Sequence, residues 1–444
     1  MQSDTDFDVG IIGGGPAGAA MAGYLAKAGV SCVVFEKELF PRPHVGESLV
    51  PAATRVLREL GFADQMDMHK FPRKYGAVWS AEADARIYDH DWEGLAPDCE
   101  AHFRFEEREQ EGVDRNHTWH VDRGKFDLLF LQHAHKLGAA VYEGVHVRQV
   151  ELNNGDPPVI RYNVGKQEMG TWVKMVVDAS GRQTLLGKQL GFRVHDKVFD
   201  QFALHTWFDG YDRGQNKADY IWIHFLPITN TWIWQIPITN TVTSIGVVTQ
   251  KKHFVGTKSE RPDFFWKCVK SRPEIYERLQ KSEQMRDFTA EADYSYSMKQ
   301  ICGDRFAMIG DAARFVDPIF SSGVSIAMSS ARFIAPEILK ALETNDFRKA
   351  SFANFERTIH NGTRNWYDFI TVYYRLNVLF TMFVNSPEHR IDVLKLLQGD
   401  VYDEQEPEVL VKMRKIVTQV ENNPRHPWHQ SLGDLTANAF TPPE

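Results

Sequence analysis

Residues 7–37 read FDVGIIGGGPAGAAMAGYLAKAGVSCVVFEK, an apolar strand, a glycine-rich turn, a helix and a second strand that ends on an acid. Gly13 allows a tight turn, Gly15 lets the backbone approach a pyrophosphate, and Gly18 permits close packing of the helix on the strand. The helix N-terminus then faces the phosphates with its dipole. Glu36 closes the second strand and is placed for the ribose hydroxyls. We predict a dinucleotide site; a glycine-rich turn between packed elements is the alternative.

The composition is that of a folded enzyme. The chain has 444 residues, 43% hydrophobic and 12% aromatic, enough to bury more than one core. A net charge of −8 without a basic block argues against nucleic acid as a partner. No signal peptide or membrane span is visible, and no pattern indicates an oligomeric state. We expect a reduced, cytoplasmic protein without a metal site, because the cysteines are dispersed, at Cys32, Cys99, Cys268 and Cys302.

Two later stretches distinguish between nucleotides. VVDASGR at 176–182 and RFAMIGDAARFVDPIFSSGVS at 305–325 each read as an apolar strand that runs into a polar turn. They resemble the internal motifs of the FAD-dependent aromatic monooxygenases, in which the aspartate matching Asp311 contacts the ribityl chain; a helix N-cap is its alternative role. The resemblance also implies that Arg123, in WHVDRGKFD, contacts the flavin and that Val147 flanks the adenine. These motifs imply that the nucleotide is FAD. Because no second glycine fingerprint follows, we expect a separate reductase to supply it as FADH2.

The pattern along the chain predicts an α/β fold. A Rossmann-like FAD-binding domain carries an inserted, mainly antiparallel β-sheet and is followed by a C-terminal helical region. Residues 219–249 read as a β-meander with two ITN turns. Aromatic residues from Trp366 to Phe383 recur at helical spacing, which is more typical of a core than of a cofactor site. The predicted boundaries are 1–75, 105–182 and 295–345 for the FAD-binding domain, 76–104 and 183–294 for the sheet-rich substrate side, and 346–444 for the helical region.

The middle strand of this meander carries Trp232 and Trp234, one residue apart. Side chains alternate along a strand, so both rings should point to one face and Ile233 to the other. Core packing is the plain alternative. The run WIWQIP resembles the WxWxIP motif of the flavin-dependent halogenases, and GGGPAG and HVGESLVP at 44–51 match the same family. The resemblance covers nearly the whole chain and is greatest to the pyoluteorin-type halogenases, which act on pyrrole tethered to a peptidyl carrier protein.

This resemblance implies an enzyme that makes hypochlorous acid from oxygen and chloride and chlorinates an electron-rich aromatic, with a pyrrolyl-loaded carrier protein as partner. Trp232 and Trp234 then disfavour oxygen transfer to the organic substrate. Lys74, in FPRKYGAVW, matches the lysine that directs hypochlorous acid. A solvated surface lysine is the alternative, and Lys70 and Arg73 look no different in isolation.

Chloride needs donors without a competing carboxylate. The resemblance implies that Ser322 and Gly323 bind it through backbone N–H groups; an ordinary strand-to-helix turn is the alternative. The remaining flavin contacts implied by the resemblance are Ala17, Arg42, His44, Val45, Ser48, Pro318 and Val324. No counterpart of the catalytic glutamate or the substrate-binding insert of the free-tryptophan halogenases can be placed, which leaves the general base open. An aromatic hydroxylase, a prenyl-chain reductase and a non-catalytic carrier-docking flavoprotein are the alternative functions.

Overall fold

The structure is a computed structural model of the chain. It describes residues 5–80, 100–152, 155–196, 198–226, 230–292 and 295–433. Cys99, most of the first ITN turn at 228–230, residues 81–99 of the predicted substrate side and residues 434–444 of the predicted helical region lie outside these ranges.

The opening strand forms the centre of a largely parallel sheet. Strand β1 (Phe7–Ile12) pairs in parallel with β2 (Cys32–Glu36) on one side and with β10 (Gln167–Asp178) on the other. The sheet order is β19-β20-β10-β1-β2-β7, and α1 (Pro16–Lys27) crosses from β1 to β2. Every residue of β2 is buried, as is expected for a parallel strand that is covered on both faces of the sheet. The other strands of this sheet are β7 (Ala140–Glu143), β8 (His146–Glu151), β9 (Val159–Val164), β19 (Cys302–Gly303) and β20 (Phe306–Met308).

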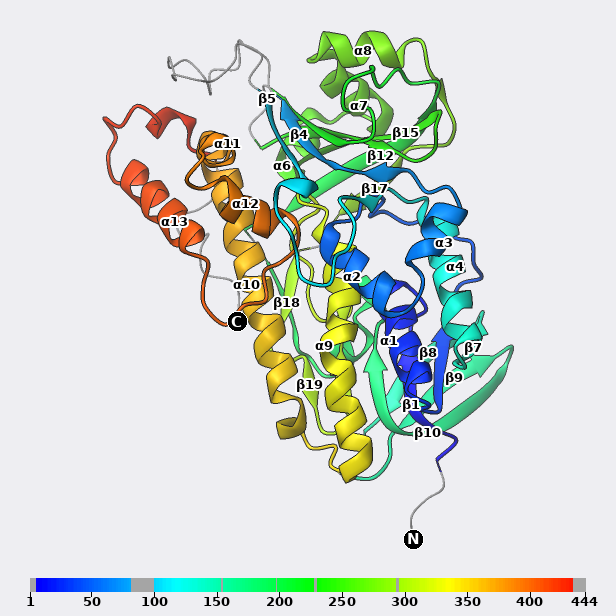
Figure 1. The fold of residues 1–444 in the computed structure, drawn as a ribbon. Helices are drawn as coiled ribbons and strands as arrows, with labels where there is room; N and C mark the ends of the chain where they lie inside the picture. Colours follow the sequence, from blue (N-terminus) through cyan, green and yellow to red (C-terminus); the bar gives the residue numbers. More distant parts are fainter. Residues whose placement is uncertain are drawn as a thin grey trace.

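A second sheet lies beside the first, towards the top of Figure 1. Its order is β16-β12-β15-β14-β13-β4-β5, and all its pairs are antiparallel except β4 with β13. Strands β13, β14 and β15 are the predicted meander, which is confirmed. The strands are β4 (Gly76–Ser80), β5 (Glu100–Arg104), β12 (Gln201–Asp209), β13 (Ile221–Phe225), β14 (Trp232–Pro237), β15 (Val242–Gln250), β16 (Glu283–Gln284) and β17 (Thr289–Ala292).

The two faces of this second sheet belong to different cores. Ile233 packs with residues of α7 (Arg261–Lys270) and α8 (Pro273–Leu279), which cover the outer face. Trp232 and Trp234 pack on the inner face with residues of the C-terminal helices. The predicted alternation along β14 is therefore confirmed.

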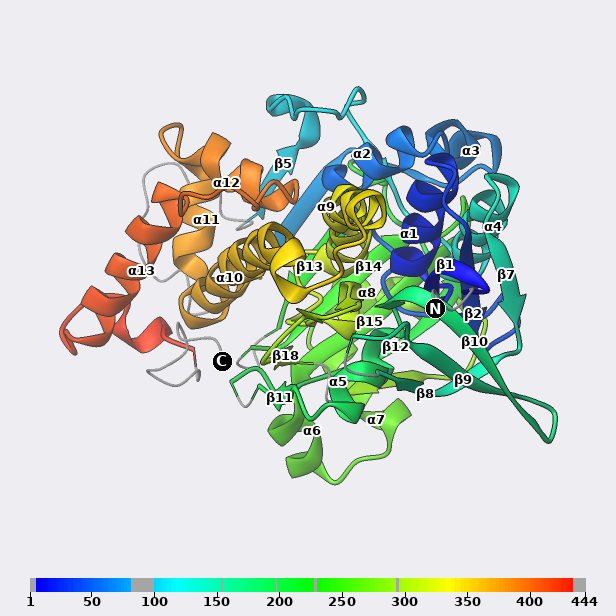
Figure 2. The same cartoon turned by 90° about the horizontal axis from the view of Figure 1, so that it is seen from below.

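The C-terminal helices pack beside α9, and α10 lies next to it (Figure 2). The predicted aromatic stripe is divided between two helices, because α10 ends at Arg375 and Leu376 adopts an extended backbone with φ −154°. Trp366, Phe369, Tyr373 and Phe380 nonetheless converge on Phe320. Helix α9 spans Ser322–Thr344, and the C-terminal helices are α10 (Ala353–Arg375), α11 (Asn377–Asn385), α12 (Arg390–Leu397) and α13 (Glu408–Glu421).

Several sequence-based expectations concern the fold alone. Cys32, Cys268 and Cys302 are buried and free. Across the described ranges, no cluster of ligating side chains could hold a metal ion, and no helix is long and apolar enough to cross a bilayer. The predicted domain boundaries stay predictions; β11 (Arg193–His195) pairs with β18 (Tyr296–Met298) and so joins two of the predicted units.

Candidate functional site

A cavity of about 500 Å³ runs from the glycine turn to the inner face of the second sheet. Every predicted cofactor residue except Gly18 lies on its wall, as do both tryptophans. These residues are Gly13, Gly15, Ala17, Glu36, Arg42, His44, Val45, Ser48, Arg123, Val147, Asp311, Pro318, Val324, Trp232 and Trp234. Segments far apart in the sequence therefore meet around one space.

The glycine turn has the geometry that the sequence predicts. Gly13 has φ +102°, and a Cβ atom there would lie 2.4 Å from the Ala179 carbonyl oxygen. A Cβ atom on Gly18 would lie 1.9 Å from the Gly13 carbonyl oxygen, so this glycine serves packing and not the cavity. Gly15 faces the cavity, where an added Cβ would meet only an Arg42 nitrogen at 3.5 Å. The Glu36 carboxylate accepts a hydrogen bond from the Gly14 N–H at 2.7 Å and fixes the turn.

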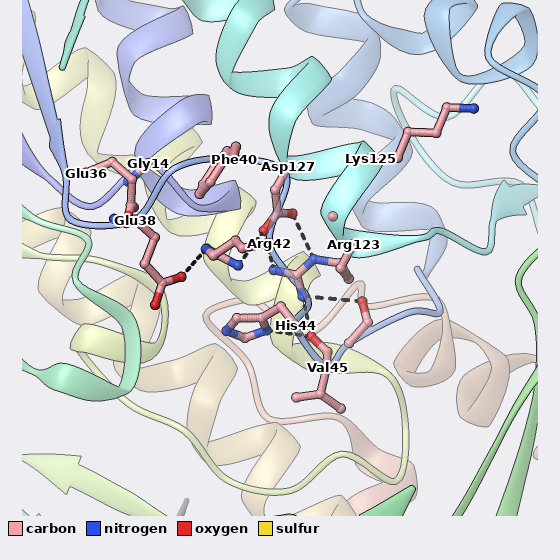
Figure 3. A network of polar contacts seen from close by, with 12 residues as sticks. Gly14, Glu36, Glu38, Phe40, Arg42, His44, Val45, Arg123, Lys125 and Asp127 are labelled. Carbon is pink, nitrogen blue, oxygen red and sulfur yellow. Dashed lines mark hydrogen bonds and ion pairs between the residues drawn. The ribbon is translucent and has the colours of Figure 1, made fainter. Parts of the chain in front are cut away.

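Two arginines order the loop opposite this turn (Figure 3). The Arg123 guanidinium donates to both oxygens of Asp127, at 2.8 and 2.9 Å, and to the Val45 carbonyl oxygen. Arg42 lies 3.3 Å from Asp127 and 2.9 Å from Glu38. The result is a pair of ordered guanidinium groups, each matched by a carboxylate, beside the N-terminus of α1. The bare backbone at Gly15, the helix N-terminus and the guanidinium donors together fit the pyrophosphate of FAD, although the role of each residue stays a prediction.

Asp311 lies across the cavity, in the turn that follows β20. It lies inside the short 3-10 helix Gly310–Ala312, whose N-cap residue is Ile309, so Asp311 does not occupy the N-cap position. Burial raises the pKa of Asp311 to about 6, and the positive charges of Arg182 and Arg123 act in the opposite direction. A half-buried carboxyl group on the cavity wall is suited to accept a hydroxyl hydrogen bond from a bound cofactor.

The two tryptophans close the other end of the cavity. Their ring centroids are 6.1 Å apart, and both indoles are buried. The Trp234 N–H donates to the Ser244 hydroxyl at 3.1 Å. The Trp232 N–H donates to the Tyr374 hydroxyl at 2.9 Å, and Tyr374 donates in turn to Asp317 at 3.1 Å. The indoles thus belong to the core and to the cavity wall at once.

The hydrogen bonds from Trp232 to Tyr374 and from Tyr374 to Asp317 were not predicted from the sequence. Burial raises the pKa of Asp317 to about 7. The two residues come from different segments, and no spacing in the sequence relates them to Trp232. Arg182 is another omission; it stands inside the quoted VVDASGR motif, which is the signal that could have identified it.

Lys74 differs from the neighbouring cations. It belongs to β3 (Arg73–Lys74), is 2% exposed, and donates from Nζ to the Leu49 carbonyl oxygen at 2.8 Å. Burial lowers its pKa to about 7. Lys70 and Arg73 are exposed, and Arg73 is paired with Asp67. Lys74 therefore is not a solvated surface lysine; it lies behind the cavity wall and not on it.

The predicted chloride site lies at the N-terminus of α9. Ser321 has φ +57°, and Ser322 is the first helical residue. Gly323 lies on the cavity wall, whereas Ser322 is buried and does not line it. No side chain caps this helix start among the described residues, so the first N–H groups are directed to the cavity end of the helix.

Comparison with known proteins gives a consistent result. An FAD binding domain model matches residues 6–347. The chain is 54% identical to a 1H-pyrrole-2-carbonyl-(peptidyl-carrier protein) chlorinase of Pseudomonas fluorescens over 447 residues, 99% of this chain and 100% of the relative. It is 30% identical to the corresponding brominase of Pseudoalteromonas luteoviolacea, over 91% of this chain and 94% of the relative. The chain belongs to the flavin-dependent halogenases.

Solved halogenase structures share the fold. The flavin-dependent brominase Bmp2 superposes with a TM-score of 0.81 at 28% identity and covers 94% of this chain and 99% of its own. The flavin-dependent halogenase CmlS gives 0.75 at 26% identity, over 93% of this chain and 70% of its own. This halogenase is thus an FAD enzyme with an α/β fold, and both expectations are confirmed.

Proposed function

We propose that this halogenase is a chlorinase that acts on a pyrrolyl group held as a thioester on a peptidyl carrier protein, with FADH2 delivered by a separate reductase. The 54% identity over essentially its full length to a chlorinase of that specificity carries the proposal. The buried Lys74 and the paired tryptophans at one end of the cavity support it.

When bound, FAD supplies the reduction of oxygen that converts chloride into hypochlorous acid. The chain's own contribution is positional. Gly13, Gly15 and Arg42 hold the pyrophosphate end, and Asp311 holds the ribityl side. The N–H groups at Ser322 and Gly323 offer chloride a site whose positive potential comes from the 23-residue helix α9.

Lys74 then directs the oxidant. The buried Lys74 amino group donates one hydrogen bond to the Leu49 carbonyl oxygen. Its remaining hydrogens can bind the oxygen of hypochlorous acid. Trp232 and Trp234 exclude water from the same end, since both rings are buried against the C-terminal helices. A dry, oriented electrophile suits an electron-rich pyrrole ring.

The test is to supply the enzyme with FAD, a flavin reductase and its nicotinamide donor, oxygen and chloride, and to weigh the products from pyrrolyl-loaded carrier and from free pyrrole-2-carboxylate. Chlorine should appear on the carrier and hardly at all on the free acid. Equal chlorination of the free acid would remove the carrier from the proposal. A hydroxylated product would contradict chlorination itself, and replacing chloride by bromide distinguishes the preferred halide.

A further inference from the structure

Three short segments form a small ladder behind the cavity wall. Lys74 pairs with Thr118, and Arg73 with Trp119, in an antiparallel register. The His120 N–H continues this ladder by donating to the Pro72 oxygen at 2.8 Å. Since strand side chains alternate, His120 and Lys74 point to the same face.

Ser48 joins that face from the third segment. It forms an antiparallel bridge with His120, flanked by the Leu49 N–H bond to Trp119 and the Val121 N–H bond to Glu47. Directly paired residues share a face of a ladder. Ser48 also lines the cavity, whereas Lys74 and His120 do not, so the shared ladder face connects these two side chains to the cavity through Ser48.

The protonation of the His120 ring follows from its hydrogen bond to Asp219. Its Nε2 lies 3.0 Å from the Asp219 carbonyl oxygen, and a carbonyl can only accept, so Nε2 carries the hydrogen. Burial and then the charge of Lys74 lower the pKa of His120 well below its ordinary value, and the ring is neutral. Nδ1 is therefore a lone-pair acceptor.

That acceptor is not used by the fold. His120 is 0% exposed, and its Nδ1 has no hydrogen-bond partner among the described residues; the same holds for the Ser48 hydroxyl. A buried polar atom without a partner destabilises the fold, and a catalytic role is one reason for such an atom to be retained.

Other buried bases near the tryptophans are less suitable. Glu47 already accepts from the Trp207 N–H at 2.6 Å, and Asp317 from the Tyr374 hydroxyl. His205 is buried with both ring nitrogens unpartnered within the described ranges, but it packs against Trp234 at 5.4 Å and belongs to a strand away from Lys74. His120 alone of these shares the ladder face with Lys74.

We infer that His120 Nδ1 is the proton acceptor of the substitution reaction, the role that the sequence leaves open. The inference rests on the proposed function. The π pair of a ring carbon forms the C–Cl bond as the Cl–O bond of hypochlorous acid breaks, and the oxygen leaves as hydroxide, which takes a proton from the Lys74 ammonium to become water. The ring C–H proton passes to Nδ1, and its electron pair restores aromaticity.

The imidazolium then returns its proton to the Lys74 amine. Ring C–H and hypochlorous acid have become C–Cl and water, and both side chains are restored. A weak base is sufficient for this step, because the chlorinated, cationic pyrrole ring that loses the proton is strongly acidic.

The test compares His120→Gln with the unchanged enzyme on pyrrolyl carrier and on its ring-deuterated form. The glutamine amide retains a donor for the Asp219 oxygen and removes the basic nitrogen. Chlorination should fall by about a hundredfold, the lower range for loss of a general base. Hypochlorous acid, trapped with a free thioether, should form at the original rate. Proton loss then limits the reaction, and a deuterium isotope effect that the unchanged enzyme lacks should appear.

His224→Gln is the matched control, a second buried histidine that lies outside the ladder and is hydrogen-bonded to Ser80, and it should show neither change. His120→Asn, which replaces Nδ1 by a non-basic oxygen, repeats the test if His120→Gln fails to fold. Wild-type rates in either His120 variant, a rate loss without an isotope effect, or an isotope effect in His224→Gln would each overturn the inference. Absence of carrier chlorination by the unchanged enzyme would instead overturn the proposed function, and the inference with it.

Discussion

The two ends of the cavity are built in different ways. At the nucleotide end, one continuous stretch, residues 7–37, supplies the strand, the turn, the helix and the acid. At the lysine end, Lys74 and the tryptophans come from β3 and β14, and short segments from elsewhere in the chain hold them in place. The first end depends on backbone shape, the second on buried side chains. Substitutions should therefore separate cofactor binding from halogenation.

Replacement of Lys74 should have the largest effect. Lys74→Met keeps most of the side-chain volume in a buried position and removes the donor, so chlorination should fall by about a hundredfold to a thousandfold, as for loss of one preorganised donor. FAD affinity should be unchanged, because Lys74 does not lie on the cavity wall. Product mass and FAD titration measure the two quantities. The exposed Lys70→Met is the control, and near-normal chlorination by Lys74→Met would contradict the assignment.

Gly15→Val should affect the opposite end. The Cβ atom there meets no backbone, so the fold accommodates the change, whereas the branched side chain enters the space proposed for the pyrophosphate. FAD affinity should fall by about a hundredfold or more with little change in the melting temperature of the cofactor-free protein. Gly18→Ala is the contrasting variant; its Cβ would lie 1.9 Å from the Gly13 oxygen, so that variant should melt lower even without FAD.

The pH dependence of stability should report the burial of Lys74. Its pKa falls from the ordinary 10.5 to about 7 on folding. Between these values the unfolded chain binds more protons at this group, so its contribution makes the fold more stable as pH rises, by at most about 1.4 kcal/mol per pH unit. Lys74→Met lacks this contribution. Its advantage in free energy of unfolding over the unchanged enzyme, measured in urea, should shrink as pH rises from 7 to 10; a constant difference would contradict the lowered pKa.

Tyr374→Phe should have the smallest effect. It removes the hydroxyl that joins the Trp232 indole to Asp317 and should cost about 1 kcal/mol of stability, with a chlorination rate a few-fold lower. FAD affinity should stay the same, because Tyr374 does not line the cavity. Thermal melting, FAD titration and product mass check the three expectations. A large loss of FAD would show that the two ends are not separable.

Sequence reasoning succeeded where the determinants are local. The spacing of Gly13, Gly15 and Gly18 and the alternation at Trp232 and Trp234 each follow from a few neighbouring residues. The division of the aromatic stripe at Leu376 was not predicted, because helical periodicity continues through the break. The Tyr374 to Asp317 contact and the Ser48–His120 pairing arise only when remote segments meet, so no local pattern contains them.

The strand that follows Lys74 has a bearing on how such enzymes diversify. Strand β4 begins at Gly76, where a Cβ atom would lie 2.0 Å from the Phe103 oxygen, and it pairs with β13, which pairs with β14. The separation of the lysine from the indoles is thus specified by peptide hydrogen bonds and is insensitive to most side-chain mutations. Surface positions around this frame can therefore change during evolution without altering that separation. In the laboratory, libraries aimed at new acceptor molecules should leave β4, β13 and β14 unchanged.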